Sequence, residues 1–242
     1  YQKSRSQHFS IIYPVEDSGL ISTTIDRFEW TYNQVCADLD CPSSLSVTQL
    51  NVKPFIVSPH WSGLNGSYTI VIPSPRITGY YDISGAIMNW ELLDDPIGQS
   101  TFDTLMPMLT QRLSGGGERW TQSSQGTFFL QAIETWELNR LSVYPNMMSL
   151  LPPKQLSNNI PLIKLESLWT LQSTPSNPEQ VANSVIFFIE QKYGVDSVSR
   201  FLKAIGPAQS FKQVIKNSLG LDEIQFEQQW QDWLKQLYAQ GS

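Results

Sequence analysis

The chain has 242 residues, of which 40% are hydrophobic and 12% aromatic, so it carries enough apolar side chains to bury a core. Its formal net charge of -6 and its pI near 4.9 argue against nucleic acid or an anionic membrane surface as a partner, because both need a concentrated basic patch. No apolar run approaches the length of a membrane span.

The first residue and the two cysteines are informative about the compartment in which the protein is located. It begins with Tyr1 rather than methionine, so we expect a processed piece of a longer protein, with any membrane anchor in the missing N-terminal region. Cys36 and Cys41 lie five residues apart. A disulfide across this short loop would suit an oxidising, extracytoplasmic setting, and two unpaired thiols are the equal alternative.

The N-terminal part predicts a strand followed by one long helix. Residues 8–13 are rich in β-branched and aromatic side chains and predict a strand that ends at Pro14. An apolar stripe at helical spacing then predicts a helix from Ser18 to about Cys36.

Further strand patterns follow the long helix. They cover residues 45–50, 53–57 and 68–72. Turn residues between the last two of these segments predict a β-hairpin. Residues 77–83 are expected to add another strand or an extended edge, and the helical period takes over from Ile87.

Two helical segments form the centre of the chain. Apolar residues recur at helical spacing in residues 102–113 and again in 129–141, and the glycine-rich turn 114–117 joins the two segments. Both segments are therefore predicted to be helices packed into a core.

A segment rich in proline and asparagine, residues 144–161, predicts a linker. We therefore expect residues 1–143 to form an α+β part that holds the two central helices, and residues 162–242 to form a helical subdomain. One compact unit is the alternative.

The C-terminal part predicts four short helices with clear starts and stops. Asn177 and Pro178 suit a helix start, and glycines suit the ends. The expected helices run from 178 to Gly194, from Asp196 to Gly206, from 210 to Gly220, and onward from Asp222. The whole chain therefore predicts an α+β fold, with a small mixed sheet and a long helix followed by a mainly helical part.

Several short motifs in this part carry a resemblance to a known family. They are an aromatic helix ending in Tyr-Gly (187–194), the segment Arg-Phe-Leu-Lys-Ala-Ile-Gly (200–206), Leu219-Gly220, and Glu-Gln-Gln-Trp (227–230). With the N-terminal His-Phe-Ser-Ile-Ile-Tyr and the helix after it, the series resembles the peptidase MA-like group of gluzincin metallopeptidases, relatives of thermolysin in fold. The resemblance implies the same α+β architecture.

The resemblance also implies where a zinc site would lie. In the family, His-Glu-x-x-His on one helix supplies two ligands and a general base, and a glutamate on the next helix supplies the third ligand. The corresponding positions here hold Met106, Pro107, Thr110 and Gln131. The chain has only two histidines, neither beside a glutamate, so we expect no metal, no cofactor and no zinc peptidase activity.

Other residues near the former cleft are candidates for binding. They are Trp120, Glu134, Trp136 and Glu137. Tryptophans there could recognise a peptide or a sugar, and core packing explains them equally well. The two glutamates are three residues apart and could form a catalytic pair, but such a pair on an amphipathic helix is more often a solvated face.

The leading hypothesis is a catalytically inactive peptidase-like domain that binds a protein or peptide, or acts as a scaffold, outside the cytoplasm. The second is a metal-free hydrolase with its site around His60 or the Glu134/Glu137 pair, although a lone loop histidine is more often packed or solvated. The third is a purely structural domain of a larger assembly. The sequence does not name the ligand.

Overall fold

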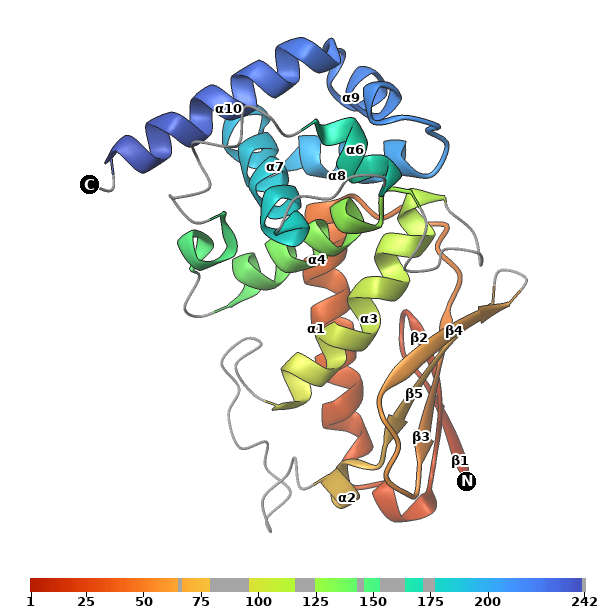
Figure 1. Ribbon diagram of the computed structural model, residues 1–242. Helices are drawn as coiled ribbons and strands as arrows, with labels where there is room; N and C mark the ends of the chain where they lie inside the picture. The colour runs from red at the N-terminus through yellow and green to blue at the C-terminus, as the bar shows by residue number, and fades with distance from the viewer. Residues whose placement is uncertain are drawn as a thin grey trace. The chain divides into compact units, whose positions relative to one another are not determined.

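The computed structural model describes residues 1–64, 67–78, 96–115, 125–142, 146–152, 164–171 and 177–240. These residues form the predicted α+β fold, with a mixed five-stranded sheet and many helices (Figure 1). None of the described helices is long and apolar enough to cross a membrane.

The chain divides into two compact units. The first comprises residues 1–109 with 141–143, and the second comprises residues 110–140 with 144–242. The division falls inside helix α3 (Pro96–Ser114), and not only at the expected linker 144–161, much of which lies outside the described residues.

The sheet belongs to the first unit. Its strands are β1 (Gln2–Arg5), β2 (Phe9–Tyr13), β3 (Thr48–Lys53), β4 (His60–Leu64) and β5 (Ser67–Pro73). The spatial order is β1-β2-β3-β5-β4. Strands β2, β3 and β5 are mutually parallel, and the edge strands β1 and β4 each pair antiparallel with their neighbour.

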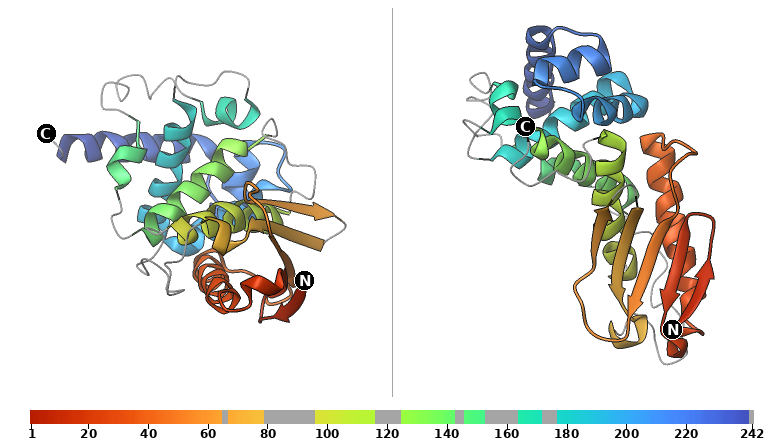
Figure 2. Two further views of the ribbon diagram at one scale, coloured as in Figure 1. Left: turned by 90° about the horizontal axis from the view of Figure 1, so that it is seen from below. Right: turned by 90° about the vertical axis from the view of Figure 1, so that its right-hand side faces the viewer.

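Alternation of side chains gives the sheet one buried face. Ile11, Leu50 and Ile70 are register neighbours across β2, β3 and β5, and all three are fully buried. Phe9 contacts Phe28 of helix α1 (Ile21–Leu39), with ring centroids 5.6 Å apart. Helix α1 therefore covers this face, and its course along the sheet can be followed in Figure 2.

Two strand predictions are wrong in detail. Residues 53–57 do not form a strand beyond Lys53, and Phe55 and Ile56 are 56% and 82% exposed. The hairpin partner of β5 is instead β4, so the predicted hairpin exists with a different first strand. Strand β1 gives no signal in the sequence, because its residues are polar and mostly exposed and so show no apolar alternation.

The region after β5 also departs from the prediction. Ile77 lies in the short helix α2 (Pro75–Thr78) rather than in a strand, and residues 79–95 lie outside the described part. A 3-10 helix, η1 (Val15–Asp17), lies between β2 and α1.

Helix α1 ends at the two cysteines. Asp40 takes the left-handed conformation that stops the helix, and Cys36 and Cys41 form a disulfide with their Cα atoms 4.8 Å apart. The structure therefore selects the disulfide from the two alternatives that the sequence left open.

The second unit is helical. It contains the end of α3 together with α4 (Thr127–Leu141), η3 (Met147–Leu150), α6 (Leu165–Thr170), α7 (Pro178–Tyr193), α8 (Val195–Ile205), α9 (Phe211–Leu219) and α10 (Glu223–Gln240). The last four confirm the predicted C-terminal helices. Stacked and edge-on rings fill its core, with Phe129 and Phe211 5.0 Å apart and Phe188 and Phe226 5.5 Å apart.

Candidate functional site

The positions that the resemblance assigns to zinc lie on α3 and α4. On α3, Met106 is fully buried and Pro107 is partly buried inside the helix. Thr110, also buried, donates a hydrogen bond from its hydroxyl to Glu134 Oε1 at 2.9 Å. Gln131 is partly buried on α4. A thioether, a proline ring and an engaged hydroxyl are poor substitutes for imidazole and carboxylate ligands.

The two glutamates of α4 do not form a solvated face. Glu137 is fully buried and Glu134 is partly buried against Thr110. The expectation is wrong for Glu137 because it shares its side of α4 with Leu130, Ile133 and Leu141, which are all buried.

Trp136 lies in the core of the second unit. It is fully buried, and its indole Nε1 donates to Glu190 Oε2 of α7 at 2.9 Å. Glu190 also pairs with Arg140 at 2.7 Å, and the Arg140 guanidinium lies 5.1 Å from the centroid of the Trp136 ring. The indole is therefore engaged by packing and by charge-assisted contacts. Trp120 lies outside the described residues.

Both histidines belong to the first unit. His60 is exposed at the start of β4, not in a loop, and its Nδ1 lies 2.8 Å from the Ser58 carbonyl oxygen. His8 pairs with Glu29 at 2.6 Å and stacks on Tyr32. The Glu134/Glu137 pair belongs to the second unit.

The part of the chain that the structure describes holds no group of three or more His, Cys, Asp or Glu side chains placed to bind a metal ion.

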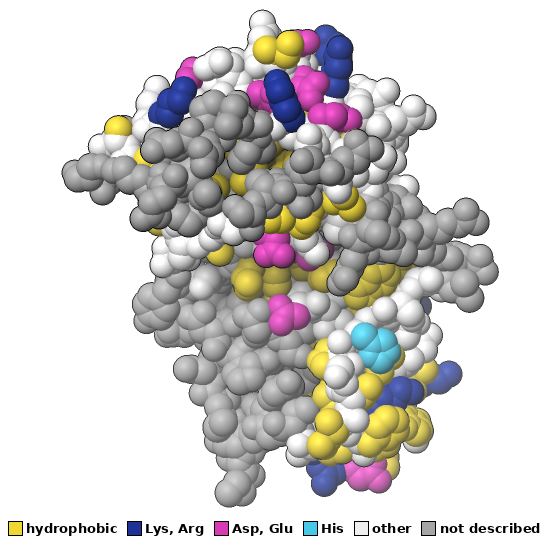
Figure 3. Space-filling model, in the orientation of Figure 1, with side chains coloured by type: hydrophobic (Ala, Val, Ile, Leu, Met, Phe, Trp, Pro, Cys, Tyr) yellow, Lys and Arg dark blue, Asp and Glu magenta, His cyan; other side chains and the backbone are white. Residues whose placement is uncertain are grey.

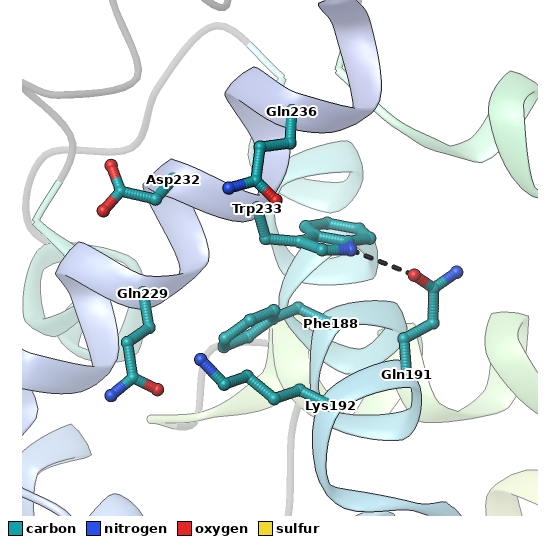
Figure 4. A pocket seen from close by; sticks show the side chains of 7 residues that line it. All are labelled: Phe188, Gln191, Lys192, Gln229, Asp232, Trp233 and Gln236. Atoms are coloured by element: carbon teal, nitrogen blue, oxygen red, sulfur yellow. Dashed lines mark hydrogen bonds between the residues drawn. The ribbon is translucent and has the colours of Figure 1, made fainter. Parts of the chain in front are cut away.

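A surface groove between α7 and α10 was not predicted from the sequence. Its volume is about 350 Å³, and its lining residues are Phe188, Gln191, Lys192, Gln229, Asp232, Trp233 and Gln236 (Figure 4). On each helix these residues recur at spacings of three or four, which places them along one side. The groove therefore follows two adjacent helix faces within the second unit.

The indole of Trp233 is the main apolar surface of the groove. Its ring lies 5.6 Å from the Phe188 ring, and its Nε1 donates to Gln191 Oε1 at 3.0 Å. Neighbouring Trp230 is instead fully buried. Trp230 and Trp233 are three residues apart on α10, and tertiary packing buries the first and leaves the second in the groove.

Amide and charged side chains surround this indole. Gln229 accepts a hydrogen bond from the Tyr193 hydroxyl at 2.5 Å, whereas Gln236 is exposed. A hydrogen bond from Gln228, with nearby Lys235 and Lys192, holds the pKa of Asp232 below its usual range. The groove thus presents one ionised carboxylate, one ammonium and three amide groups.

Comparison of the chain with protein-family models, with curated proteins and with solved structures returns no match.

Proposed function

We propose that this protein is a catalytically inactive peptidase-like domain that binds a polypeptide partner outside the cytoplasm. The sequence supports the loss of zinc chemistry, because the chain lacks His-Glu-x-x-His and its two histidines have no adjacent glutamate. The buried Thr110 supports it too. Its hydroxyl stands at a ligand position of the resembled family and is hydrogen-bonded to Glu134.

The groove between α7 and α10 is the observation that carries the binding role. An extended polypeptide offers backbone donors and acceptors in alternation, and a glutamine amide can both donate and accept. Gln191, Gln229 and Gln236 line the groove beside the Trp233 indole, which supplies apolar contact area. Lys192 and Asp232 supply one charge of each sign, which favours a mixed sequence over a highly charged one.

The disulfide supports the proposed location. Disulfides form and persist in oxidising compartments and are rare in the cytosol. The Cys36–Cys41 bridge uses both cysteines of the chain, so it fits a protein that folds in an oxidising environment.

The inactive character is tested with zinc and an unfolded protein substrate. The purified chain is dialysed against zinc chloride and then incubated with casein, with and without a chelator. We expect less than stoichiometric zinc and no chelator-sensitive cleavage. Tight one-to-one zinc binding together with chelator-sensitive cleavage would overturn this part of the proposal.

The binding role is tested by selection from a random peptide display library. We expect peptides enriched on the natural protein to lose binding on the Gln236→Ala and Trp233→Phe variants, because both change the groove while keeping the helix. Gln225→Ala is the matched control, since Gln225 is an exposed glutamine of the same helix outside the groove. Equal enrichment on all variants would exclude the groove as the binding site.

A further inference from the structure

A second pocket lies in the first unit, where the parallel strands end. Strands β2, β3 and β5 run in the same direction, so their carboxyl ends meet at one edge of the sheet. The residues that directly follow them, Pro14, Pro54 and Ser74, line one pocket of about 250 Å³. The carboxyl edge of parallel strands is where open sheets commonly bind ligands, because the loops diverge there.

Asp17 is the polar residue that distinguishes this pocket. It lines the pocket, yet its side chain is only 1% exposed. Its Oδ1 accepts a hydrogen bond from the Ser74 hydroxyl at 2.7 Å. Its Oδ2 is buried and accepts no hydrogen bond from the described residues. A buried carboxylate oxygen without a donor is costly, so a ligand that supplies a donor to Asp17 would gain a strong hydrogen bond.

The charged residues around Asp17 indicate what kind of ligand group would donate a hydrogen bond to it. Glu16 adds a second carboxylate to the lining, and Arg76 provides one guanidinium. That guanidinium donates from Nη1 to the backbone oxygen of Glu16 at 3.0 Å, so one of its donors is already engaged. Two carboxylates and one guanidinium leave an excess of negative charge, which favours a cationic donor over a neutral one.

The surroundings of the pocket are apolar. Ile77 lines it, and three large hydrophobic residues within two positions of lining residues in the sequence are exposed. They are Val15, Phe55 and Ile56, which are 52%, 56% and 82% exposed. Figure 3 shows hydrophobic side chains gathered over the lower end of the sheet, beside side chains of both charges. Several exposed apolar side chains around one pocket are typical of a binding site.

We propose that this pocket binds a primary ammonium group that carries an apolar substituent. The ammonium donates to the buried Asp17 carboxylate, and the substituent packs on Ile77 and on the rings of Pro14 and Pro54, which line the pocket. Two sources share this chemistry: a free hydrophobic amine, and the N-terminus of a peptide that begins with an apolar residue. The pocket is separate from the α7/α10 groove, and the proposal stands independently of it.

The test is a titration of the whole chain, labelled with ¹⁵N, with n-hexylamine at neutral pH. We expect saturable shifts of the amide signals of Asp17, Ser74 and Arg76. 1-Hexanol, which has the same chain without the charge, should bind about tenfold more weakly or worse, because its hydroxyl can donate to the carboxylate but carries no positive charge. This comparison uses the unaltered protein, so it does not depend on whether a variant folds.

Variants locate the interaction. Asp17→Asn should weaken hexylamine binding about tenfold, and Ile77→Ser should weaken hexylamine and hexanol alike, because Ile77 lines the pocket. Asp26→Asn is the matched control, because Asp26 is an exposed aspartate on α1 away from the pocket lining, and it should leave both affinities unchanged.

Two peptides distinguish the sources of the ammonium. Binding of Leu-Gly-Gly but not of its N-acetylated form would identify a peptide N-terminus as the ligand class. Binding of hexylamine without the peptide would identify a free amine, and either result supports the proposal. It is overturned if hexylamine causes no saturable shift at the pocket, or if hexanol binds equally well.

Discussion

At the scale of single residues, one glycine is required by close packing between two segments of the second unit. A Cβ atom added at Gly206 would lie 1.8 Å from the Ser114 carbonyl oxygen at the end of α3. That distance is far below van der Waals contact, so backbone must move to accept any side chain.

We therefore expect Gly206→Ala to lower the free energy of unfolding by about 2 kcal/mol or more, measured by urea denaturation. Gly19→Ala is the control, because a Cβ there would meet nothing within 4 Å. If the two variants unfold at the same urea concentration, the close approach of Gly206 to Ser114 is wrong.

Glu29 links stability to pH in the first unit. Burial alone would raise its pKa, but hydrogen bonds from Ser6 and from the backbone and ring of His8 outweigh burial and lower it. Because the pKa of Glu29 is lower in the folded state than in the unfolded state, its carboxylate stabilises the fold fully at pH values above the unfolded-state pKa. This stabilisation is lost as the pH falls through the folded pKa.

We expect Glu29→Gln to unfold more easily at neutral pH than the natural protein, and to lose less stability on acidification. The measurement is a series of urea unfolding curves between neutral and acidic pH. Asp26→Asn serves as a carboxylate control from the same helix, because Asp26 is exposed. Parallel stability curves for the natural protein and Glu29→Gln would contradict the assignment.

At the scale of the elements, two helix starts that look alike in sequence differ in structure. Ser210 caps α9, and its hydroxyl accepts a hydrogen bond from the Gln213 amide at 3.3 Å. Asn177 precedes α7 at the equivalent position, but its side chain makes no capping hydrogen bond. Proline at the next position favours the start of α7, because its fixed φ suits the first helical turn and the N–H it lacks would have no partner there.

Ser210→Ala should therefore destabilise the protein by about 1 kcal/mol, whereas Asn177→Ala should change stability by much less. Thermal unfolding followed by circular dichroism measures both. A larger loss for Asn177→Ala would show that capping at α7 differs from the structure.

The elements also explain which predictions succeeded. Helices α7, α8 and α9 each end at a glycine, and α7 starts at Asn177-Pro178, so local sequence was enough to find them. The short segment 53–57 looked like a strand because it is apolar, but strand formation needs a neighbouring strand to accept its hydrogen bonds. Strand β5 pairs with β4 instead, which leaves Phe55 and Ile56 exposed.

At the scale of the whole molecule, each compact unit has its own apolar core. Ile11 is fully buried in the sheet of the first unit, and Ile186 is fully buried in α7 of the second. Separate cores predict that unfolding is not a single two-state transition.

Calorimetry of a matched pair of variants tests this expectation. Ile11→Ala and Ile186→Ala each remove the same atoms and should each cost about 2 to 5 kcal/mol, but within different units. We expect two transitions in the heat-capacity profile, and we expect each variant to lower the midpoint temperature of a different one. A single transition whose midpoint temperature falls equally in both variants would mean that the two units unfold as one.

The candidate sites show the limit of sequence reasoning. The missing zinc ligands could be read directly, because a histidine that is absent from the sequence cannot be supplied by folding. The groove residues are spread over α7 and α10, and the residues of the strand-end pocket are spread between Pro14 and Ile77. No local pattern joins them.

The sequence by itself determined the α+β class, the C-terminal helices and the lack of a His-Glu-x-x-His motif, because these depend on residue identity and on spacing within one segment. The tertiary structure alone decided the strand order, the Cys36–Cys41 disulfide, the burial of Glu137 and the different surroundings of Trp230 and Trp233. These features depend on which distant segments come together. That choice is made by the burial of apolar surface over the whole chain, and not by any one stretch of it.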